Sequence, residues 1–186
     1  MTIIQGQKIV LRPYQDGDAE IILESSNNPT IRRLTATFAT FTLEQTQQYV
    51  ARFAHATDRV GFIIAHPTTL EALGEIVILN IDADSRSANI RVSLFYEADF
   101  NKGYGSEAMR LMVDYAFQTL KLHRLGLDVL SLNPRAFHVY EKVGFKREGI
   151  LRDVLFYEGQ YHDEIIMSIL EHEWESRPIF AQPAAL

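Results

Sequence analysis

The strongest constraint on the fold is the segment 95–120, where the end of an apolar strand passes through two glycines into a long amphipathic helix. It reads FYEADFNKGYGSEAMRLMVDYAFQTL, and from Ala108 its apolar residues recur at three- and four-residue steps. The first amides of a helix lack intrahelical partners, and the helix dipole adds partial positive charge there. Gly103 and Gly105 would let a bulky anion approach this backbone. The segment therefore predicts a phosphate-binding turn, although a tight strand-to-helix connection would use the same glycines.

Two familiar phosphate motifs do not match this turn. A P-loop would require Gly-Lys followed by Ser or Thr after four intervening residues, and that pattern is absent. A dinucleotide fingerprint would have a third glycine or an alanine at the sixth position, where Ala108 stands. Such a turn opens a Rossmann domain, whereas this one lies past the middle of the chain. We therefore expect a phosphorylated ligand other than NAD.

Length and composition indicate one soluble globular domain. The 186 residues suffice to bury roughly two-thirds of the unfolded surface, and the chain is 47% hydrophobic and 23% charged. We expect a single domain over 1–186, with 171–186 as a peripheral tail. No apolar run approaches the ~20 residues of a membrane span, and the N-terminus lacks the basic start and apolar core of a signal peptide. These features predict a cytoplasmic protein with no membrane partner.

Several chemistries are disfavoured by composition. The chain has no cysteine, which excludes disulfides, thiolate metal sites and a cysteine nucleophile that could carry an acyl group. Its 6 histidines are scattered without an HxxxH pair, so no metal is expected. The net charge of −6 disfavours a broad nucleic-acid surface and is compatible with a cationic substrate.

The order of predicted elements indicates an α/β fold with a mixed, mostly antiparallel central sheet of about seven strands flanked by about four helices. The strands are predicted at 8–13, 60–65, 74–81, 87–96, 123–130, 147–157 and 160–170. The helices are predicted from Asp16 or Asp18 to Ser26, and at 42–56, 104–120 and 133–143. Residues 30–41 are expected to be irregular, since Asn27-Asn28-Pro29 looks like a helix break.

Local signals support several of these boundaries. Thr42 and Gln45 form a capping-box pattern, and Asn133 precedes a proline at the first helical position. The helix at 104–120 lies between two strands of one sheet, so a right-handed crossover makes the strands at 87–96 and 123–130 parallel. We expect a wedge between these two strands that opens at the glycine turn.

Three segments together resemble the GNAT superfamily of acyl-CoA-dependent N-acetyltransferases. These are the opening VLRPYQDGDAE, the turn NKGYGSEA and the helical segment NPRAFHVYEKVGF. The resemblance covers nearly the whole chain and is strongest to the branch of ribosomal-protein alanine acetyltransferases and spermidine acetyltransferases. It implies a GNAT-like sheet with its parallel pair splayed at the acyl-CoA site.

The resemblance also implies roles for individual residues. Main-chain amides would hold the pyrophosphate of acetyl-CoA at Asn101, Lys102, Gly103, Tyr104, Gly105 and Ser106. The strand end at Leu94 and Phe95 would pair its main chain with the pantetheine arm, and one of these N–H groups would polarise the thioester carbonyl. Asn133 would bind the pantetheine or phosphate region, Arg135 would reach the nucleotide end, and Tyr140 would face the departing sulfur.

The sequence departs from the family pattern at two positions. Phe100 stands where relatives usually have Gln or Arg, which removes one side-chain contact but leaves the main-chain donors in place. Asn89 matches a strand position where many relatives carry the glutamate that activates the amine through water. The identity of the general base is therefore open.

Direct transfer in a ternary complex is the simplest mechanism for a chain without cysteine. Tyr140 is our choice for the acid, since a phenol of pKa about 10 stays protonated near neutrality. Glu75 is a candidate base, and the alternative is that it is an outward-facing strand residue. His138 is better explained as a surface residue, and a water chain ending on main-chain carbonyls would serve equally well.

The acceptor amine is not determined by the sequence. A protein N-terminus and a polyamine are both suggested by the resemblance, but residues 27–43 contain two arginines and no acidic residue. This favours a peptide N-terminus, another small amine or an anionic acceptor such as an amino acid. A non-catalytic acyl-CoA-binding regulatory module is the alternative from another class. The exposed C-terminal hairpin would suit a homodimer.

Overall fold

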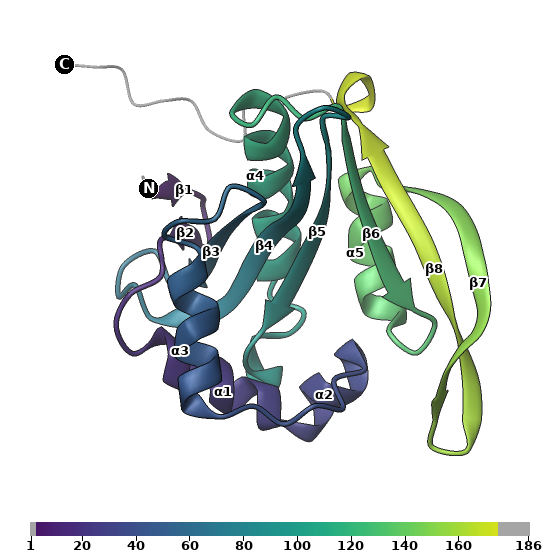
Figure 1. Ribbon diagram of the computed structural model, residues 1–186, viewed down its shortest axis with the longest axis horizontal. Coiled ribbons are helices and arrows are strands. Elements are labelled where there is room, and N and C mark those ends of the chain that lie inside the picture. Colours follow the sequence, from purple (N-terminus) through teal and green to yellow (C-terminus); the bar gives the residue numbers. More distant parts are fainter. Residues whose placement is uncertain (1–2, 175–186) are drawn as a thin grey trace.

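The protein is built on one mixed sheet with helices on both faces (Figure 1). The computed structural model describes residues 3–174. The strands are β1 (Ile4–Gln5), β2 (Val10–Arg12), β3 (Arg59–Ala65), β4 (Ala72–Asp82), β5 (Ser87–Leu94), β6 (Arg124–Leu130), β7 (Lys146–Tyr157) and β8 (Gln160–Leu170). Their order across the sheet is β1-β2-β3-β4-β5-β6-β8-β7. The α-helices are α1 (Asp18–Asn27), α2 (Pro29–Thr35), α3 (Leu43–Arg52), α4 (Tyr104–Gln118) and α5 (Pro134–Val143).

Alternating side chains of the strands divide the apolar interior between the two faces. Phe62 and Ile64 of β3 join the larger cluster, which includes α4 and α5 residues. Ile63 and Ala65 join a smaller cluster on the opposite face, beside residues of α1. Met112 of α4 is fully buried, as its place on the predicted apolar stripe requires.

The structure confirms the α/β fold with a mixed sheet. It has one strand and one α-helix more than the sequence predicted. The short β1 pairs with β2 and was not predicted. The expectation that residues 30–41 are irregular is wrong for α2. Asn28 accepts hydrogen bonds from the N–H groups of Thr30 and Ile31, and Pro29 occupies the first turn. The Asn-Pro pair that looked like a break therefore starts a helix, just as Asn133 does for α5.

A buried ion pair replaces the predicted aspartate cap of α1. The N-cap position belongs to Gly17, at φ 91°, and makes no side-chain hydrogen bond. Asp18 instead accepts two hydrogen bonds from the guanidinium of Arg12, both at 2.8 Å. Both side chains are buried, and Arg12 also donates to the carbonyl of Leu70 at 3.1 Å. The pair thus ties the end of β2 to the start of α1.

The parallel pairing of β5 with β6 is confirmed and is very short. Only Ser87–Asn89 pairs with Arg124–Gly126. Beyond that point β5 stays paired with β4 up to Leu94, while β6 stays paired with β8 up to Leu130. The two strands diverge toward the end of the sheet where α2 lies (Figure 1). We call the gap between β5 and β6 beyond these three pairs the wedge.

The expected peripheral tail is described only up to Trp174, and residues 175–186 lie outside the described range. The indole N–H of Trp174 donates to Asp114 of α4 at 2.7 Å, so the start of the tail packs on the domain. Within residues 3–174, no helix has the length and apolar character needed to cross a membrane.

We expect Asp18→Ala to lower the free energy of unfolding by about 3–5 kcal/mol, because it leaves Arg12 buried without its carboxylate. Urea denaturation would measure this loss. The control is Asp58→Ala, which removes the exposed partner of Arg59 and should barely move the unfolding midpoint. Equal, small effects of the two substitutions would contradict the structural role of the Arg12–Asp18 pair.

Candidate active site

The N-terminus of α4 lies at the wedge and has the features of an anion site. Gly103 is its N-cap, with φ 89° in the left-handed region and no side-chain cap. The amides of Tyr104, Gly105 and Ser106 open the helix and have no carbonyl a turn earlier to bond within it. They remain available to an anion, aided by the helix dipole.

The two glycines of this turn serve different purposes. Gly103 has a backbone conformation that other residues adopt only with strain, and an added Cβ would lie 3.2 Å from the ammonium of Lys8. Gly105 has no positive φ, and an added Cβ would meet nothing within 4 Å. Glycine within a helix costs up to about 1 kcal/mol relative to alanine. Since packing does not demand it, open space for a ligand is the remaining physical reason for Gly105.

A cavity of about 560 Å³ runs from this turn along the wedge and is called the first cavity here. Nine of the predicted site residues line it, namely Leu94, Asn101, Gly103, Tyr104, Gly105, Ser106, Asn133, Arg135 and Tyr140. Two others do not. Lys102 pairs with Asp99 at 2.9 Å, and Phe95 packs into the smaller apolar cluster on the other face. The structure thus gathers the predicted ligand-binding residues from β5, α4 and α5 around one space.

The end of β5 has one main-chain N–H free for a ligand. The N–H of Phe95 donates to the carbonyl of Leu73 at 2.9 Å and is already used. Successive residues of a strand direct their N–H groups to opposite edges. The N–H of Leu94 therefore faces the wedge, where pairing with β6 ended at Asn89. Of the two predicted donors, Leu94 is the one that an incoming chain could reach.

Two polar side chains of the first cavity also have partners within the protein. The Asn133 carboxamide accepts from the N–H of Ala136 at 3.2 Å and donates to the carbonyl of Leu34 at 3.4 Å, so it caps α5 and holds the end of α2. The guanidinium of Arg135 lies 3.6 Å from the ring centre of Phe100. Phe100, which departs from the family pattern, thus supports a cation at the edge of the cavity.

Tyr140 projects from α5 into the first cavity and is 8% exposed. Burial, and secondarily the negative charge of Asp128, raises the pKa of Tyr140 to about 12. Its hydroxyl has no hydrogen-bond partner among residues 3–174. Tyr140 is therefore a protonated phenol at neutral pH with a donor left for a ligand.

A second cavity, of about 570 Å³, lies on the other side of β5. It is lined by residues of α1, α2, α3, β4 and β5, and it shares Ile31, Thr35 and Ser93 with the first cavity. A molecule in the second cavity could therefore meet one in the first beside Ser93. The predicted acid and base are on different sides of this junction, with Tyr140 in the first cavity and Glu75 in the second.

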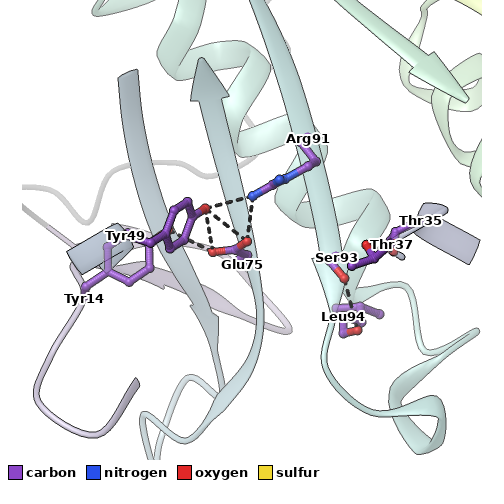
Figure 2. A network of polar contacts seen from close by, with 8 residues as sticks. All are labelled: Tyr14, Thr35, Thr37, Tyr49, Glu75, Arg91, Ser93 and Leu94. Atoms are coloured by element: carbon purple, nitrogen blue, oxygen red, sulfur yellow. Dashed lines mark hydrogen bonds and ion pairs between the residues drawn. The ribbon is translucent and has the colours of Figure 1, made fainter. Parts of the chain in front are cut away.

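A polar network surrounds Glu75 at the base of the second cavity (Figure 2). Glu75 is buried on β4 and is paired across the sheet with Ser93 of β5. Its carboxylate accepts hydrogen bonds from Tyr14 at 3.1 Å, from Tyr49 at 3.2 Å and from Arg91 at 3.0 Å. The view of Glu75 as an outward-facing strand residue exposed to solvent is therefore wrong.

The network keeps its phenols protonated. Burial, followed by the negative charge of Glu75, raises the pKa of both Tyr14 and Tyr49 above the ordinary phenol value. The sequence did not predict Tyr14, Tyr49 and Arg91 as site residues, because they come from separate segments that meet only in the fold. One signal was present, because the polar residues Asn89, Arg91 and Ser93 alternate along β5 and so share a face.

Two residues weighed for acid–base roles lie elsewhere. Asn89 sits in the closed part of the parallel pair, opposite Gly126, and lines neither cavity. His138 lines the exposed side of the first cavity, and its ring lies 3.4 Å from the carboxylate of Glu141.

Comparison with known proteins identifies the family. The model of the acetyltransferase (GNAT) domain matches residues 8–146. The chain belongs to the GNAT family. It is accordingly an acetyl-CoA-dependent N-acetyltransferase with the GNAT fold.

The relatives include enzymes with different acceptors. A spermidine N(1)-acetyltransferase of Vibrio cholerae is 26% identical over 92% of this chain and 98% of its own length. The spermidine N(1)-acetyltransferase of Escherichia coli K12 is 28% identical over 91% of this chain and 89% of its own. A putative ribosomal N-acetyltransferase of Bacillus subtilis, YdaF, is 35% identical over 55% of each chain.

One similar solved structure is a complex with coenzyme A. The crystal structure of the Vibrio cholerae spermidine N-acetyltransferase in complex with CoA and spermine has a TM-score of 0.82 to this chain, at 26% identity, and covers 89% of this chain and 97% of that one. The residues of this chain fit such a ligand on their own evidence, because the α4 amides, the space at Gly105 and the N–H of Leu94 all face the first cavity.

We expect Gly105→Ala to weaken coenzyme A binding at least tenfold while leaving the unfolding midpoint unchanged or higher, because the methyl group fills ligand space and alanine favours the helix. Calorimetry with coenzyme A and thermal unfolding would measure both effects. Gly149→Ala is the matched control, since its added Cβ also meets nothing and it lines neither cavity. Unchanged affinity in Gly105→Ala would mean that the pyrophosphate does not lie at this turn.

Proposed function

We propose that this chain moves the acetyl group of acetyl-CoA to a primary amine, either a small amine or a peptide N-terminus, while both substrates are bound. The observation that carries this proposal is the junction of the two cavities at Ser93, next to the wedge-facing N–H of Leu94. The carbon–sulfur bond breaks, the carbon–nitrogen bond forms and the amine proton passes to water, while the sulfur leaves as a thiolate that takes up a proton from water. The absence of cysteine supports direct transfer.

The first cavity is the proposed site for acetyl-CoA. The amides of Tyr104, Gly105 and Ser106 bind the pyrophosphate, while Arg135 and Lys142 line the same cavity and supply positive charge for the nucleotide end. The pantetheine arm pairs with the open edge of β5 as an added strand. Acetyl-CoA supplies the activated acyl group, and the protein supplies its alignment with the amine.

Two donors of the chain act on the reacting atoms. The N–H of Leu94 polarises the thioester carbonyl, and removing one such donor costs about 2.7–4 kcal/mol in other enzymes. Tyr140 donates a hydrogen bond to the departing sulfur. Because burial raises the pKa of Tyr140 above that of an ordinary phenol, which already exceeds that of a thiol, complete proton transfer to the thiolate is unfavourable. Stabilisation of developing charge is therefore the larger part of its role.

Glu75 is assigned the role of positioning the side chains that surround the acceptor in the second cavity. It is the only carboxylate among the described residues that line that cavity, and it lies opposite Ser93. Its oxygens already accept hydrogen bonds from two phenols and a guanidinium. The proton of the amine would therefore leave through water, with Glu75 fixing Tyr49 and Arg91 around the acceptor.

The β7–β8 hairpin is the proposed surface for a homodimer. Leu151, Val154, Phe156 and Tyr161 are exposed apolar or aromatic residues on it, and β7 is an edge strand. The rings of Phe156 and Tyr161 lie 4.9 Å apart. An exposed edge with such side chains is typical of a protein contact.

Release of free thiol from acetyl-CoA in the presence of primary amines would test the proposed activity. A thiol reagent reports coenzyme A alone, because the protein has no cysteine. We expect amine-dependent release with intersecting initial-velocity lines, as for a ternary complex. If acetyl-CoA binds but no amine stimulates release, the chain is a regulatory acyl-CoA-binding module instead.

We expect Tyr140→Phe to lower turnover at least tenfold while the affinity for acetyl-CoA stays within a few-fold, because the substitution removes the donor to sulfur and keeps the ring. Steady-state kinetics and calorimetry would separate the two quantities. Tyr115→Phe is the control, since Tyr115 is a partly buried tyrosine of α4 that lines neither cavity. Unchanged turnover in Tyr140→Phe would remove this residue from the mechanism.

A further inference from the structure

The charge of the second cavity is unusual for a site that takes an amine. Its charged lining residues are Arg52, Glu75 and Arg91, which are two cations and one anion. The other polar residues that line it carry hydroxyl or amide groups, namely Ser25, Ser26, Thr35, Thr37, Gln45, Thr46, Gln48, Tyr49 and Ser93. The cavity therefore offers a surplus of positive charge to its ligand.

The single anion is not available to a cationic acceptor. Glu75 is 6% exposed, and its two oxygens are engaged by Tyr14, Tyr49 and Arg91. Figure 2 shows the hydroxyl of Tyr49 and the guanidinium of Arg91 directed at the carboxylate of Glu75. A further cation would have to displace one of these donors, which would leave a buried polar group unpaired.

Arg91 is held in place yet has donors to spare. One terminal nitrogen serves both Tyr49, at 2.8 Å, and Glu75, at 3.0 Å. Its Nε and its other terminal nitrogen have no partner among residues 3–174, and its side chain is 56% exposed. Each of these two nitrogens can donate a charge-assisted hydrogen bond to a carboxylate, although the two do not form one bidentate edge, because the terminal nitrogen between their N–H groups is the one already used.

Arg52 adds a second cation to the same space. It lies in the last turn of α3, is exposed, and forms no ion pair with another described residue. Both guanidiniums line the same cavity, that of Arg52 from α3 and that of Arg91 from β5. An anion between them would be attracted by both.

The position of Arg91 relates this anion site to the transfer point. Arg91 and Ser93 are two residues apart on β5, so they share a face and lie about 7 Å apart along the strand. Ser93 marks the junction with the first cavity. A small molecule with its anionic end at Arg91 would thus place a nearby amine at the junction.

We propose that the acceptor is an amine that also carries a carboxylate, such as an amino acid, and that Arg91 and Arg52 bind this carboxylate. The inference rests on the proposed acetyltransferase function and names its substrate class. A polyamine would bring several positive charges to a cavity that already holds two guanidiniums and one fully engaged carboxylate. A peptide N-terminus has an amide group, and no carboxylate, next to its amine.

The test compares acceptors that differ only in the carboxylate. Kinetics with acetyl-CoA would use the common amino acids, their C-terminal amides, spermidine and a tripeptide amide. We expect at least one amino acid to have a kcat/KM at least tenfold above that of its amide and of spermidine. Arg52→Gln and Arg91→Gln should each raise the KM for that amino acid at least tenfold, and the ratio of kcat/KM between the amino acid and its amide should fall by a similar factor.

The test has one control variant and does not depend on Arg91 alone. Arg152→Gln removes an exposed arginine of β7 that lines neither cavity and should leave all constants unchanged. Arg52 lies on an exposed helix end, so its substitution tests the proposal even if Arg91→Gln does not fold. An amide or spermidine used as well as the amino acid, or a normal KM in Arg52→Gln and Arg91→Gln, would overturn the proposal.

A second readout separates this proposal from the proposed function. Thermal unfolding with each acceptor alone reports binding without turnover, because a ligand of the folded state raises the melting temperature. No turnover with any amine, together with stabilisation by amino acids but not by their amides, would refute the transferase proposal and support the anion site. No carboxylate-dependent stabilisation, together with turnover of neutral amines, would refute the anion site and support the transferase.

Discussion

The site depends on the fact that β5 and β6 pair over only three residues. Beyond Asn89 and Gly126, the two strands keep their outer partners, β4 and β8, and separate from each other. The main-chain groups on the facing edges then lack ladder partners, and a buried backbone group without a partner costs about 1–3 kcal/mol. Such an edge has to face water or a polar ligand. The wedge thus provides a hydrogen-bonding edge in the middle of a sheet, where a fully paired strand would have none.

The elements on either side of the wedge complete the site by their connections. The crossover from β5 to β6 requires a helix, and α4 therefore starts beside the open end of β5 with its free amides. The next helix, α5, follows β6 and carries Tyr140 to the same cavity. On the opposite face, β4 and β5 present Glu75, Arg91 and Ser93 to the space under α3. One splayed strand pair thus brings together the first cavity, our proposed site for the anionic donor, and the second cavity, our proposed site for its acceptor.

Local signals in the sequence were sufficient to predict most of the fold. The capping pattern at Thr42 and Gln45 forms as expected, and the glycine turn and the parallel pair are where the sequence placed them. The same Asn-Pro signal was interpreted as a break at Asn28 and as a start at Asn133, and it starts a helix in both places. The cap itself depends only on the asparagine side chain and the proline ring, which both places share.

Only part of the candidate site could be predicted from the sequence, and the reasons are physical. The predicted residues of the first cavity lie in or next to two of the motifs that carry the resemblance, so the resemblance could assign them. The choice between Leu94 and Phe95 as the free donor depends on strand register, which the sequence does not specify. The network of Tyr14, Tyr49, Glu75 and Arg91 joins four segments, and its members look like ordinary tyrosines and strand charges until the fold brings them together.

A crystal structure of this chain with coenzyme A would test the central claim most directly. We expect the pyrophosphate to contact the amides of Tyr104 to Ser106 and the pantetheine arm to lie in the wedge, hydrogen-bonded to Leu94. Coenzyme A bound elsewhere, or a wedge closed by further pairing of β5 with β6 beyond Asn89, would contradict it.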